Sequence, residues 1–245
     1  MLKFSIITPS FNQGKFIRDT IESVINQNYW NYEHIVIDGG STDETIDILT
    51  EYKHLKWISE KDKGAADAIN KGFNMADGDI VTWINSDDYY ESNIFEMVND
   101  YFAKDMNIEF LYGNRTVFMP FKNKFYLEKT TYQDAHKLIH ISADIVRQPC
   151  SFYRLSLLKK VGMLNVNLKL VFDYDLFIRM FLQTKPYYVD KSFAVQRDYE
   201  DTLTRRNLKR QATEIFKVSR KYGSKLTDPI IIQSVIKKLL FPNKF

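Results

Sequence analysis

The chain lacks the features on which several large classes of protein depend. Its single cysteine, Cys150, cannot form an internal disulfide, so the 245 residues are compatible with a reducing compartment. Its 9 glycines form neither the three-glycine loop of dinucleotide-binding folds nor the P-loop of nucleotide triphosphatases. No apolar run approaches the length of a membrane-spanning helix, and no secretory leader precedes the first apolar run. We therefore expect a cytoplasmic globular protein that is neither a dehydrogenase nor a P-loop enzyme.

Positive charge is concentrated at the C-terminal end. Residues 205–245 contain eleven Lys and Arg against the two acids Glu214 and Asp228, a formal charge of 11 − 2 = +9. The whole chain carries +3, so residues 1–204 carry 3 − 9 = −6. A basic segment can lie against anionic lipid headgroups or phosphate-bearing ligands, and it can equally be a solvated helical face. The first alternative predicts peripheral contact with the cytoplasmic face of a membrane.

Short apolar runs alternate with stretches of helical spacing along the first part of the chain. The runs that predict strands are Phe4–Thr8, Glu33–Asp38, Leu55–Ser59 and Asp79–Ile84. Strand and helix in alternation predict an α/β fold with a mainly parallel central sheet flanked by helices. After this region, residues 112–129 lose the regular period, and we expect an irregular segment or a hairpin there.

Local signals predict where two helices begin. Ser41 and Glu44 have the spacing of a capping box, in which Ser41 accepts a hydrogen bond from the amide of Glu44 and Glu44 reaches back. Helical spacing returns over residues 173–184, with Asp173 at the start, where the helix dipole favours a carboxylate.

The C-terminal part predicts two more helices, Leu208–Tyr222 and Asp228–Leu240, the second with a proline in its first turn. We therefore divide the chain into an α/β domain, residues 1–204, and a basic helical C-terminal extension, residues 205–245.

The tetrad Asn85-Ser86-Asp87-Asp88 directly follows a buried apolar run. It therefore offers oxygen ligands at the carboxyl edge of the sheet, where open α/β folds bind their ligands. Asp38 ends the second predicted strand, and with Asp173 it would converge with the tetrad on one cleft. Such a cleft suits a metal-bound phosphate, although Asp and Asn also form ordinary turns, above all at Asp38.

Two other kinds of catalytic site have little support. His136 and His140 stand four apart, which is a spacing of zinc ligands, but Lys137 occupies the place of the general-base glutamate of zinc proteases. No Gly-x-Ser-x-Gly elbow is present for a serine hydrolase.

Several separate motifs, in the same order, resemble those of family 2 glycosyltransferases with the GT-A fold, of the kind that build bacterial surface polysaccharides. The motifs are Thr8–Asn12, Ile37–Asp43, Asp62–Gly72, Ala76–Asp79, Trp83–Asp88, Gln148–Arg154, Val161–Gly162 and Asp173–Arg179. They reach to about residue 180, so the basic extension lies outside the resemblance. The fold implied is the Rossmann-like GT-A sheet.

The resemblance implies a role for individual residues in binding the donor. Thr8, Pro9 and Phe11 would line the nucleotide pocket, and Asp38 would accept a hydrogen bond from a base that is uridine-like in many members. Asn85 would hydrogen-bond a ribose hydroxyl. Asp67, within the third motif, would join the donor-binding set.

The resemblance also implies the metal site and the catalytic base. Asp87 would bind Mg²⁺ or Mn²⁺, supported by Asp88, and Asp173 would deprotonate the acceptor hydroxyl. The reaction implied is a single displacement that inverts the anomeric centre. Sugars stack on aromatic rings, and Tyr89 and Tyr90 are candidates for the acceptor side.

Two positions depart from the family pattern. Asn85 replaces the first Asp of the usual Asp-x-Asp motif and brings no charge to the metal. Phe172 stands where many members have Glu, which leaves Asp175 as a second candidate for the base.

The partners that the resemblance implies are a nucleotide-sugar donor, expected to be of the uridine diphosphate type, and a glycan or lipid-linked acceptor, with no nucleic acid. Two alternatives remain at this point, a nucleotidyltransferase and a non-catalytic nucleotide-sugar-binding protein.

Overall fold

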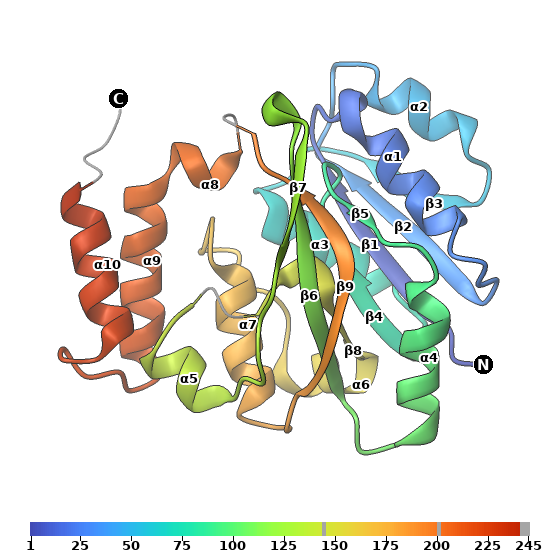
Figure 1. Ribbon diagram of the computed structural model, residues 1–245. Helices are drawn as coiled ribbons and strands as arrows, with labels where there is room; N and C mark the ends of the chain where they lie inside the picture. The colour runs from blue at the N-terminus through green and yellow to red at the C-terminus, as the bar shows by residue number, and fades with distance from the viewer. Residues whose placement is uncertain (144–145, 200–201, 241–245) are drawn as a thin grey trace.

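A computed structural model describes residues 1–143, 146–199 and 202–240 and shows one large mixed sheet with helices on both of its faces (Figure 1). The strand order is β3-β2-β1-β4-β8-β6-β9-β5, and β7 pairs with β6 outside this path. The first four strands are parallel to one another. Beyond β4 the sheet is mixed, because β8 is antiparallel to both β4 and β6.

The strands have the following bounds: β1 Phe4–Ser10, β2 Tyr32–Asp38, β3 Leu55–Ser59, β4 Ile80–Trp83, β5 Tyr89–Tyr90, β6 Phe110–Met119, β7 Lys124–Glu128, β8 Ser151–Arg154 and β9 Tyr187–Arg197. The α-helices are α1 Gly14–Ile25, α2 Thr45–Glu51, α3 Ala65–Met75, α4 Ile94–Lys104, α5 Ala135–His140, α6 Leu155–Val161, α7 Phe172–Phe181, α8 Leu203–Arg206, α9 Leu208–Lys221 and α10 Pro229–Leu240. Two short 3₁₀ turns lie at Pro120–Lys122 and Gln148–Cys150.

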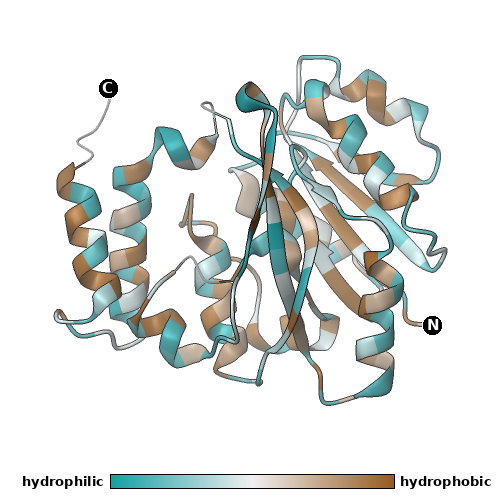
Figure 2. Cartoon of the chain, in the orientation of Figure 1, coloured by the Kyte–Doolittle hydropathy of each residue, from teal (hydrophilic) through white to brown (hydrophobic). Residues whose placement is uncertain are grey.

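The predicted α/β order is confirmed. All four apolar runs form strands, and all residues of β1 and β4 are buried, as expected for strands covered on both faces. The brown strands at the centre of Figure 2 lie between helices that carry both brown and teal segments. The irregular segment near residues 112–129 is the antiparallel hairpin of β6 and β7.

The predicted capping box is wrong. Helix α2 begins at Thr45, and its N-cap residue Glu44 makes no side-chain capping bond. The Ser41 hydroxyl instead donates to Asp38 and accepts from the backbone N–H of Asn12, at 2.7 Å for the second bond. Asp43 serves the helix start, because its Oδ1 accepts from the amide of Thr45 at 3.1 Å. The hydroxyl of Ser41 therefore forms hydrogen bonds between loops and does not cap the helix, contrary to what the local pattern predicted.

The two predicted C-terminal helices are confirmed as α9 and α10, which lie side by side in opposite directions (Figure 1). Buried residues of this pair, Val218, Ile230 and Ile231, belong to the same apolar cluster as residues of α5 and α7. The division of the chain between residues 204 and 205 stays a prediction, and the core is continuous across it. Within the described ranges, every helix is too short or too polar to cross a bilayer.

His34 in β2 makes stability depend on pH. Complete burial, with a smaller contribution from His54, lowers the pKa of His34 to about 3, and its Nε2 lies 2.9 Å from the Thr8 hydroxyl. The ring is therefore neutral in the folded state and gains a proton on unfolding once the pH falls below its ordinary pKa of 6.5. We expect the free energy of unfolding to fall by up to about 1.4 kcal/mol per pH unit below this value.

The test is urea unfolding between pH 7 and pH 5 of the parent chain and of His34→Gln, which keeps a polar side chain near Thr8. The glutamine variant should show the flatter dependence. His136→Gln, at an exposed position, is the matched control and should keep the parent slope. Equal slopes for the parent and His34→Gln would contradict the assignment.

Candidate active site

A cleft of about 850 Å³ opens at the carboxyl edge of the parallel strands, in the size range of small-molecule sites. Residues at the end of β1 and after β4 line it: Pro9, Ser10, Phe11, Asn85, Ser86, Asp87 and Asp88. Other walls come from the start of α7, from the hairpin of β6 and β7, and from α9 and α10. Elements far apart in the sequence therefore meet at this one cavity.

The loops after β1, β2 and β3 meet at one corner of the cleft. Asn12 adopts a left-handed backbone conformation, with φ of 51°, and its side chain accepts from the amide of Thr42 at 2.9 Å. A Cβ atom placed on Gly39 would lie 2.7 Å from a carboxylate oxygen of Asp62 and 3.3 Å from the ring of Phe11. A larger residue at position 39 would therefore require the Asp62 side chain to move. Phe11 is 59% exposed beside it and offers an aromatic face to the cleft.

The tetrad after β4 carries two buried carboxyl groups. Burial raises the pKa of Asp87, against the opposing hydrogen bond from the Tyr199 hydroxyl at 2.8 Å. Burial, followed by the neighbouring charge of Asp87, holds the pKa of Asp88 well above its usual range. A bound cation would favour the ionised form of both carboxyl groups and would offset the repulsion between their charges.

Arg197, at the end of β9, holds the tetrad in place. Its guanidinium donates to the carbonyl of Asp87 at 2.8 Å, and its backbone N–H donates to Oδ1 of Asp88 at 3.0 Å. The same guanidinium pairs with Asp19 and stands 4.8 Å from the ring centre of Tyr89. Because backbone and side chain both contribute, the orientation of the two carboxylates depends on this arginine.

Asp173 lies in the first turn of α7 and borders the same cleft as Asp87. Its Oδ1 accepts from the amide of Tyr174 at 2.8 Å. The second candidate base, Asp175, is buried and lies in an ionic network, where it accepts from Arg179 at 3.0 Å and from Lys221 at 3.1 Å. Asp175 does not line the cleft, so the geometry favours Asp173.

Three residues of the predicted donor set do not line the cleft. Thr8 is fully buried against His34, and Asp38 is fully buried under the turn that it stabilises through Gly40 and Ser41. Asp67 accepts from the amide of Lys63 at 3.1 Å in the first turn of α3. Their roles toward the donor stay predictions. Pro9, Phe11, Asn85, Asp87, Asp88 and Asp173 do share the cleft.

The two tyrosines proposed for the acceptor side, Tyr89 and Tyr90, do not line the cleft. Tyr90 is buried in the apolar cluster, where its ring lies 5.2 Å from that of Phe95, so its nomination is wrong. β5 pairs its backbone with β9 and turns this side chain inward. Tyr89 is half-buried under the guanidinium of Arg197 and does not line the cleft.

Sequence reasoning missed a group of basic residues along the cleft. Glu128 of β7 accepts from Arg115 of β6 at 2.7 Å and from Arg147 at 3.2 Å. Lys169 reaches the carbonyl of Lys63 at 2.6 Å. Arg115, Arg147 and Lys169 line the cleft and bring positive charge to a site expected to hold phosphates, although Glu128 offsets part of it. The motifs near the strand ends gave no signal for them, because they come from a hairpin and loops without a regular period.

The residues present fit a divalent cation only together with oxygens from a bound ligand. Within residues 1–143, 146–199 and 202–240, no group of three or more His, Cys, Asp or Glu side chains could hold a metal ion. Mg²⁺ sites commonly use one or two carboxylates and complete the shell with substrate phosphates and water. Asp87 and Asp88 meet that description. The zinc alternative at His136 and His140 gains no third ligand within the same ranges.

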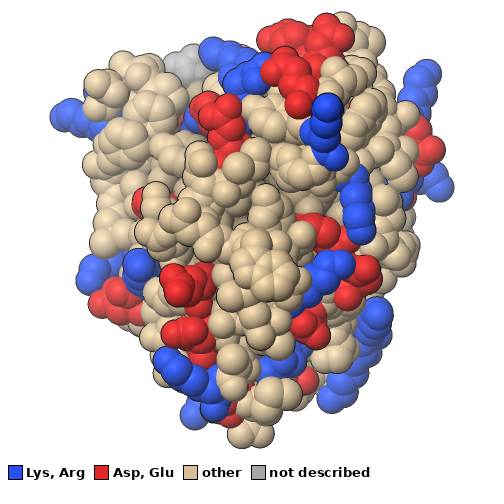
Figure 3. All heavy atoms as spheres, turned by 90° about the vertical axis from the view of Figure 1, so that its right-hand side faces the viewer, with Lys and Arg blue, Asp and Glu red and all other residues tan. Residues whose placement is uncertain are grey.

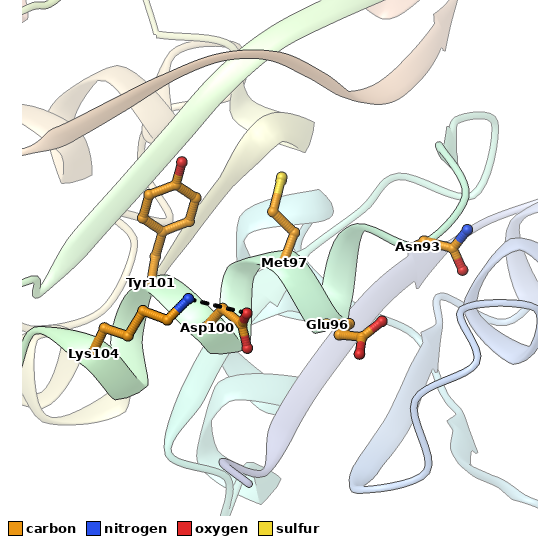
Figure 4. A pocket seen from close by; sticks show the side chains of 6 residues that line it. All are labelled: Asn93, Glu96, Met97, Asp100, Tyr101 and Lys104. Atoms are coloured by element: carbon orange, nitrogen blue, oxygen red, sulfur yellow. Dashed lines mark hydrogen bonds and ion pairs between the residues drawn. The ribbon is translucent and has the colours of Figure 1, made fainter.

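A second hollow of about 450 Å³ lies along α4, lined by Asn93, Glu96, Met97, Asp100, Tyr101 and Lys104 (Figure 4). Its residues all come from this helix and its N-cap, and Lys104 pairs with Asp100 at 3.3 Å within the hollow. None of the sequence motifs contributes to it. The larger cleft is therefore the candidate active site.

Comparison with known proteins identifies a family that this chain matches. Residues 5–162, more than half of the chain, match the family described as glycosyl transferase family 2. An uncharacterized glycosyltransferase of Rickettsia typhi is 26% identical over 230 residues, which cover 91% of this chain and 72% of that protein. Chondroitin synthase of Escherichia coli is 34% identical over 118 residues, which are 46% of this chain and only 17% of the synthase.

Solved structures show the same fold. The S. aureus protein TarS, residues 1–349 in complex with UDP-GlcNAc, superposes with a TM-score of 0.74 at 18% identity, covering 98% of this chain and 73% of that one. A mannosyltransferase from Pyrobaculum calidifontis in complex with GDP-Man and Mn²⁺ gives a TM-score of 0.66 at 14% identity, covering 96% of this chain and 69% of the other. The expected GT-A fold is confirmed.

Proposed function

Because the chain belongs to glycosyl transferase family 2, we propose that its cleft moves a sugar from a nucleotide diphosphate, with inversion, onto a glycan or lipid-linked acceptor. The observation that supports this most is the shared cleft. Asp87 and Asp173, 86 positions apart in the sequence, line the same cavity from the end of β4 and the start of α7. Such a transfer uses a cation toward the leaving diphosphate, which Asp87 would hold, and a general base toward the acceptor, which Asp173 would supply.

The nucleoside would bind at the corner formed by the first three strand-to-helix loops. The exposed ring of Phe11 can stack on the base, and the hydroxyl of Ser10 has no hydrogen-bond partner among the described residues. We propose a uridine diphosphate donor, since the TarS structure with the same fold holds UDP-GlcNAc. Asn85, beside the tetrad's carboxylates, would hydrogen-bond the ribose.

Asp87, supported by Asp88, would hold Mg²⁺ or Mn²⁺ together with the diphosphate oxygens, and the structural neighbour with GDP-Man contains Mn²⁺. When bound, the cation supplies Lewis-acid stabilisation of the departing diphosphate. The chain adds its own cations, because Arg115, Arg147 and Lys169 line the same cleft. Arg197 would fix the tetrad before the donor arrives.

Asp173 would accept the proton of the acceptor hydroxyl as its oxygen attacks the anomeric carbon. As the new C–O bond forms, the bond to the diphosphate breaks, and the leaving group takes the electron pair. Positive charge that develops on the sugar ring is then close to a carboxylate. A positioned general base contributes about 10² to 10⁴-fold in rate.

The acceptor is proposed to be a growing glycan or a lipid-linked sugar of a surface polysaccharide. Chondroitin synthase, whose matched segment is a small part of its length, is itself named for polymer synthesis. Residues of α9 and α10 also line the cleft and would contact the acceptor.

A panel of UDP-sugars and GDP-sugars, incubated with the chain and Mn²⁺, tests the donor assignment. We expect slow release of uridine diphosphate from one UDP-sugar, because water can replace the absent acceptor. Release of pyrophosphate instead would indicate nucleotidyl transfer. Release of no nucleotide from any donor, with thermal shifts that show binding, would favour the non-catalytic alternative.

A further inference from the structure

Helix α10 is apolar on two opposite faces. Ile230, Ile231 and Ser234 are buried against the rest of the protein. The opposite face, which we name the outer face of α10, consists of Ile232, Val235, Ile236, Leu239 and Leu240, and these side chains are between 42% and 76% exposed. Their spacing of three and four residues places them in one stripe along the helix. A continuous exposed stripe of this kind, unlike single exposed apolar residues, indicates a binding surface.

Helix α9, which lies against α10, presents a basic face. Arg210, Lys217 and Arg220 are exposed and stand seven and ten positions apart, so they share one side of the helix. Lys238 adds a positive charge next to the apolar stripe on α10 itself. By contrast, the face of the molecule shown in Figure 3 has positive and negative side chains interspersed. In contrast to that face, residues 205–245 contain only two acids, Glu214, which pairs with Arg210 at 3.0 Å, and Asp228.

From this combination, we propose that the outer face of α10 and the basic face of α9 dock the protein onto the surface of an anionic membrane. Apolar side chains that enter the boundary between headgroups and acyl chains, with lysine and arginine at the headgroups, form the usual pattern of an interfacial helix. Each basic side chain near an anionic surface strengthens binding about fivefold. Membrane lipid is favoured over a second copy of the chain, because two segments that each carry a formal +9 repel one another.

The docked orientation would place the cleft about one helix diameter, roughly 10 Å, from the lipid surface. The inner sides of the same two helices, including Gln211, Ile215 and Gln233, line the cleft. A lipid-linked acceptor could then reach the cleft from the bilayer without leaving it. This further step rests on the proposed function, whereas the docking itself does not.

Flotation of the full chain with vesicles tests the docking without donor or acceptor. We expect binding to vesicles of phosphatidylglycerol and phosphatidylcholine, and much weaker binding to phosphatidylcholine alone. Val235→Ser with Leu239→Ser should weaken binding at least about tenfold, because two apolar side chains no longer enter the lipid. Trp30→Ser, which removes an exposed ring elsewhere, should leave it unchanged.

The charge is tested separately by Lys217→Glu with Lys238→Glu, which should weaken binding about twentyfold or more and reduce its dependence on salt. Lys104→Glu, on α4, is the matched control. Absence of flotation by the parent chain with anionic vesicles would overturn the proposal. If the parent chain does not bind vesicles and instead sediments as a dimer, and if the Val235 and Leu239 changes dissociate this dimer, the outer face of α10 binds a second copy of the chain.

Discussion

Asp173→Asn is expected to lower turnover at least a hundredfold while the donor still binds. The amide keeps the size of the carboxylate and can accept the hydrogen bond from Tyr174, but it cannot take a proton from the acceptor. Loss of a general base costs about 10² to 10⁴-fold. Because Asp173 is not among the proposed contacts to the nucleotide or the metal, the dissociation constant of the donor should change little. Turnover with a saturating acceptor and calorimetry with the donor measure the two quantities.

Asp175→Asn tests the second candidate for the general base. Asp175 is buried between Arg179 and Lys221, so its loss leaves cationic partners without their carboxylate. We expect a decrease in the free energy of unfolding of about 1 to 2 kcal/mol, because hydrogen bonds to a charged group are lost, while Lys221 is exposed and Arg179 keeps its backbone partners. Turnover of the folded fraction should remain near the parent value. The opposite pattern, with full turnover in Asp173→Asn and loss in Asp175→Asn, would move the base to Asp175.

Asp87→Ala is expected to abolish donor binding that depends on Mn²⁺. The structure offers the cation only this carboxylate and its neighbour Asp88, because no larger cluster of ligands exists within the described ranges. The change to alanine removes one of the two proposed protein ligands and its negative charge, so the site would attract the divalent cation less strongly. Calorimetry with uridine diphosphate, with and without Mn²⁺, should show that the metal no longer tightens binding.

A control for this change is Asp47→Ala, which removes an exposed carboxylate from α2 outside the cleft. It should bind uridine diphosphate and Mn²⁺ as the parent does. If Asp87→Ala and Asp47→Ala gave the same affinity in the presence of the metal, Asp87 would have no role as a ligand. Circular dichroism and thermal unfolding confirm that both variants are folded before the comparison is made.

The parts of the fold that the sequence predicted are those where pattern and burial agree. β1 and β4 are short apolar runs that are buried on both faces, and α9 and α10 have both a helical period and a glycine between them. The place of the tetrad at the carboxyl edge of the sheet was predictable, because it directly follows the buried strand β4. Its presence on one cleft with Asp173 is what the sequence pattern suggested.

The parts that could not be predicted depend on contacts between distant segments. Ser41 has a capping pattern, but the neighbouring loop at Asn12 uses its hydroxyl instead. Arg197 and Tyr199 hold the tetrad from the end of β9, more than a hundred positions along the chain, and no local pattern links them to it. The sequence predicted the helices α9 and α10 but not their contact with the cleft, because the motifs end before them.

The contact between Gly39 and Asp62 constrains how this cleft can change in evolution. A Cβ atom at position 39 would lie 2.7 Å from a carboxylate oxygen of Asp62, so a larger residue at 39 requires the Asp62 side chain to move. A change at 62 that shortens or redirects this side chain makes alanine at 39 easier to accept. We therefore expect substitutions at these two positions to be coupled in evolution, with the change at 62 preceding the change at 39.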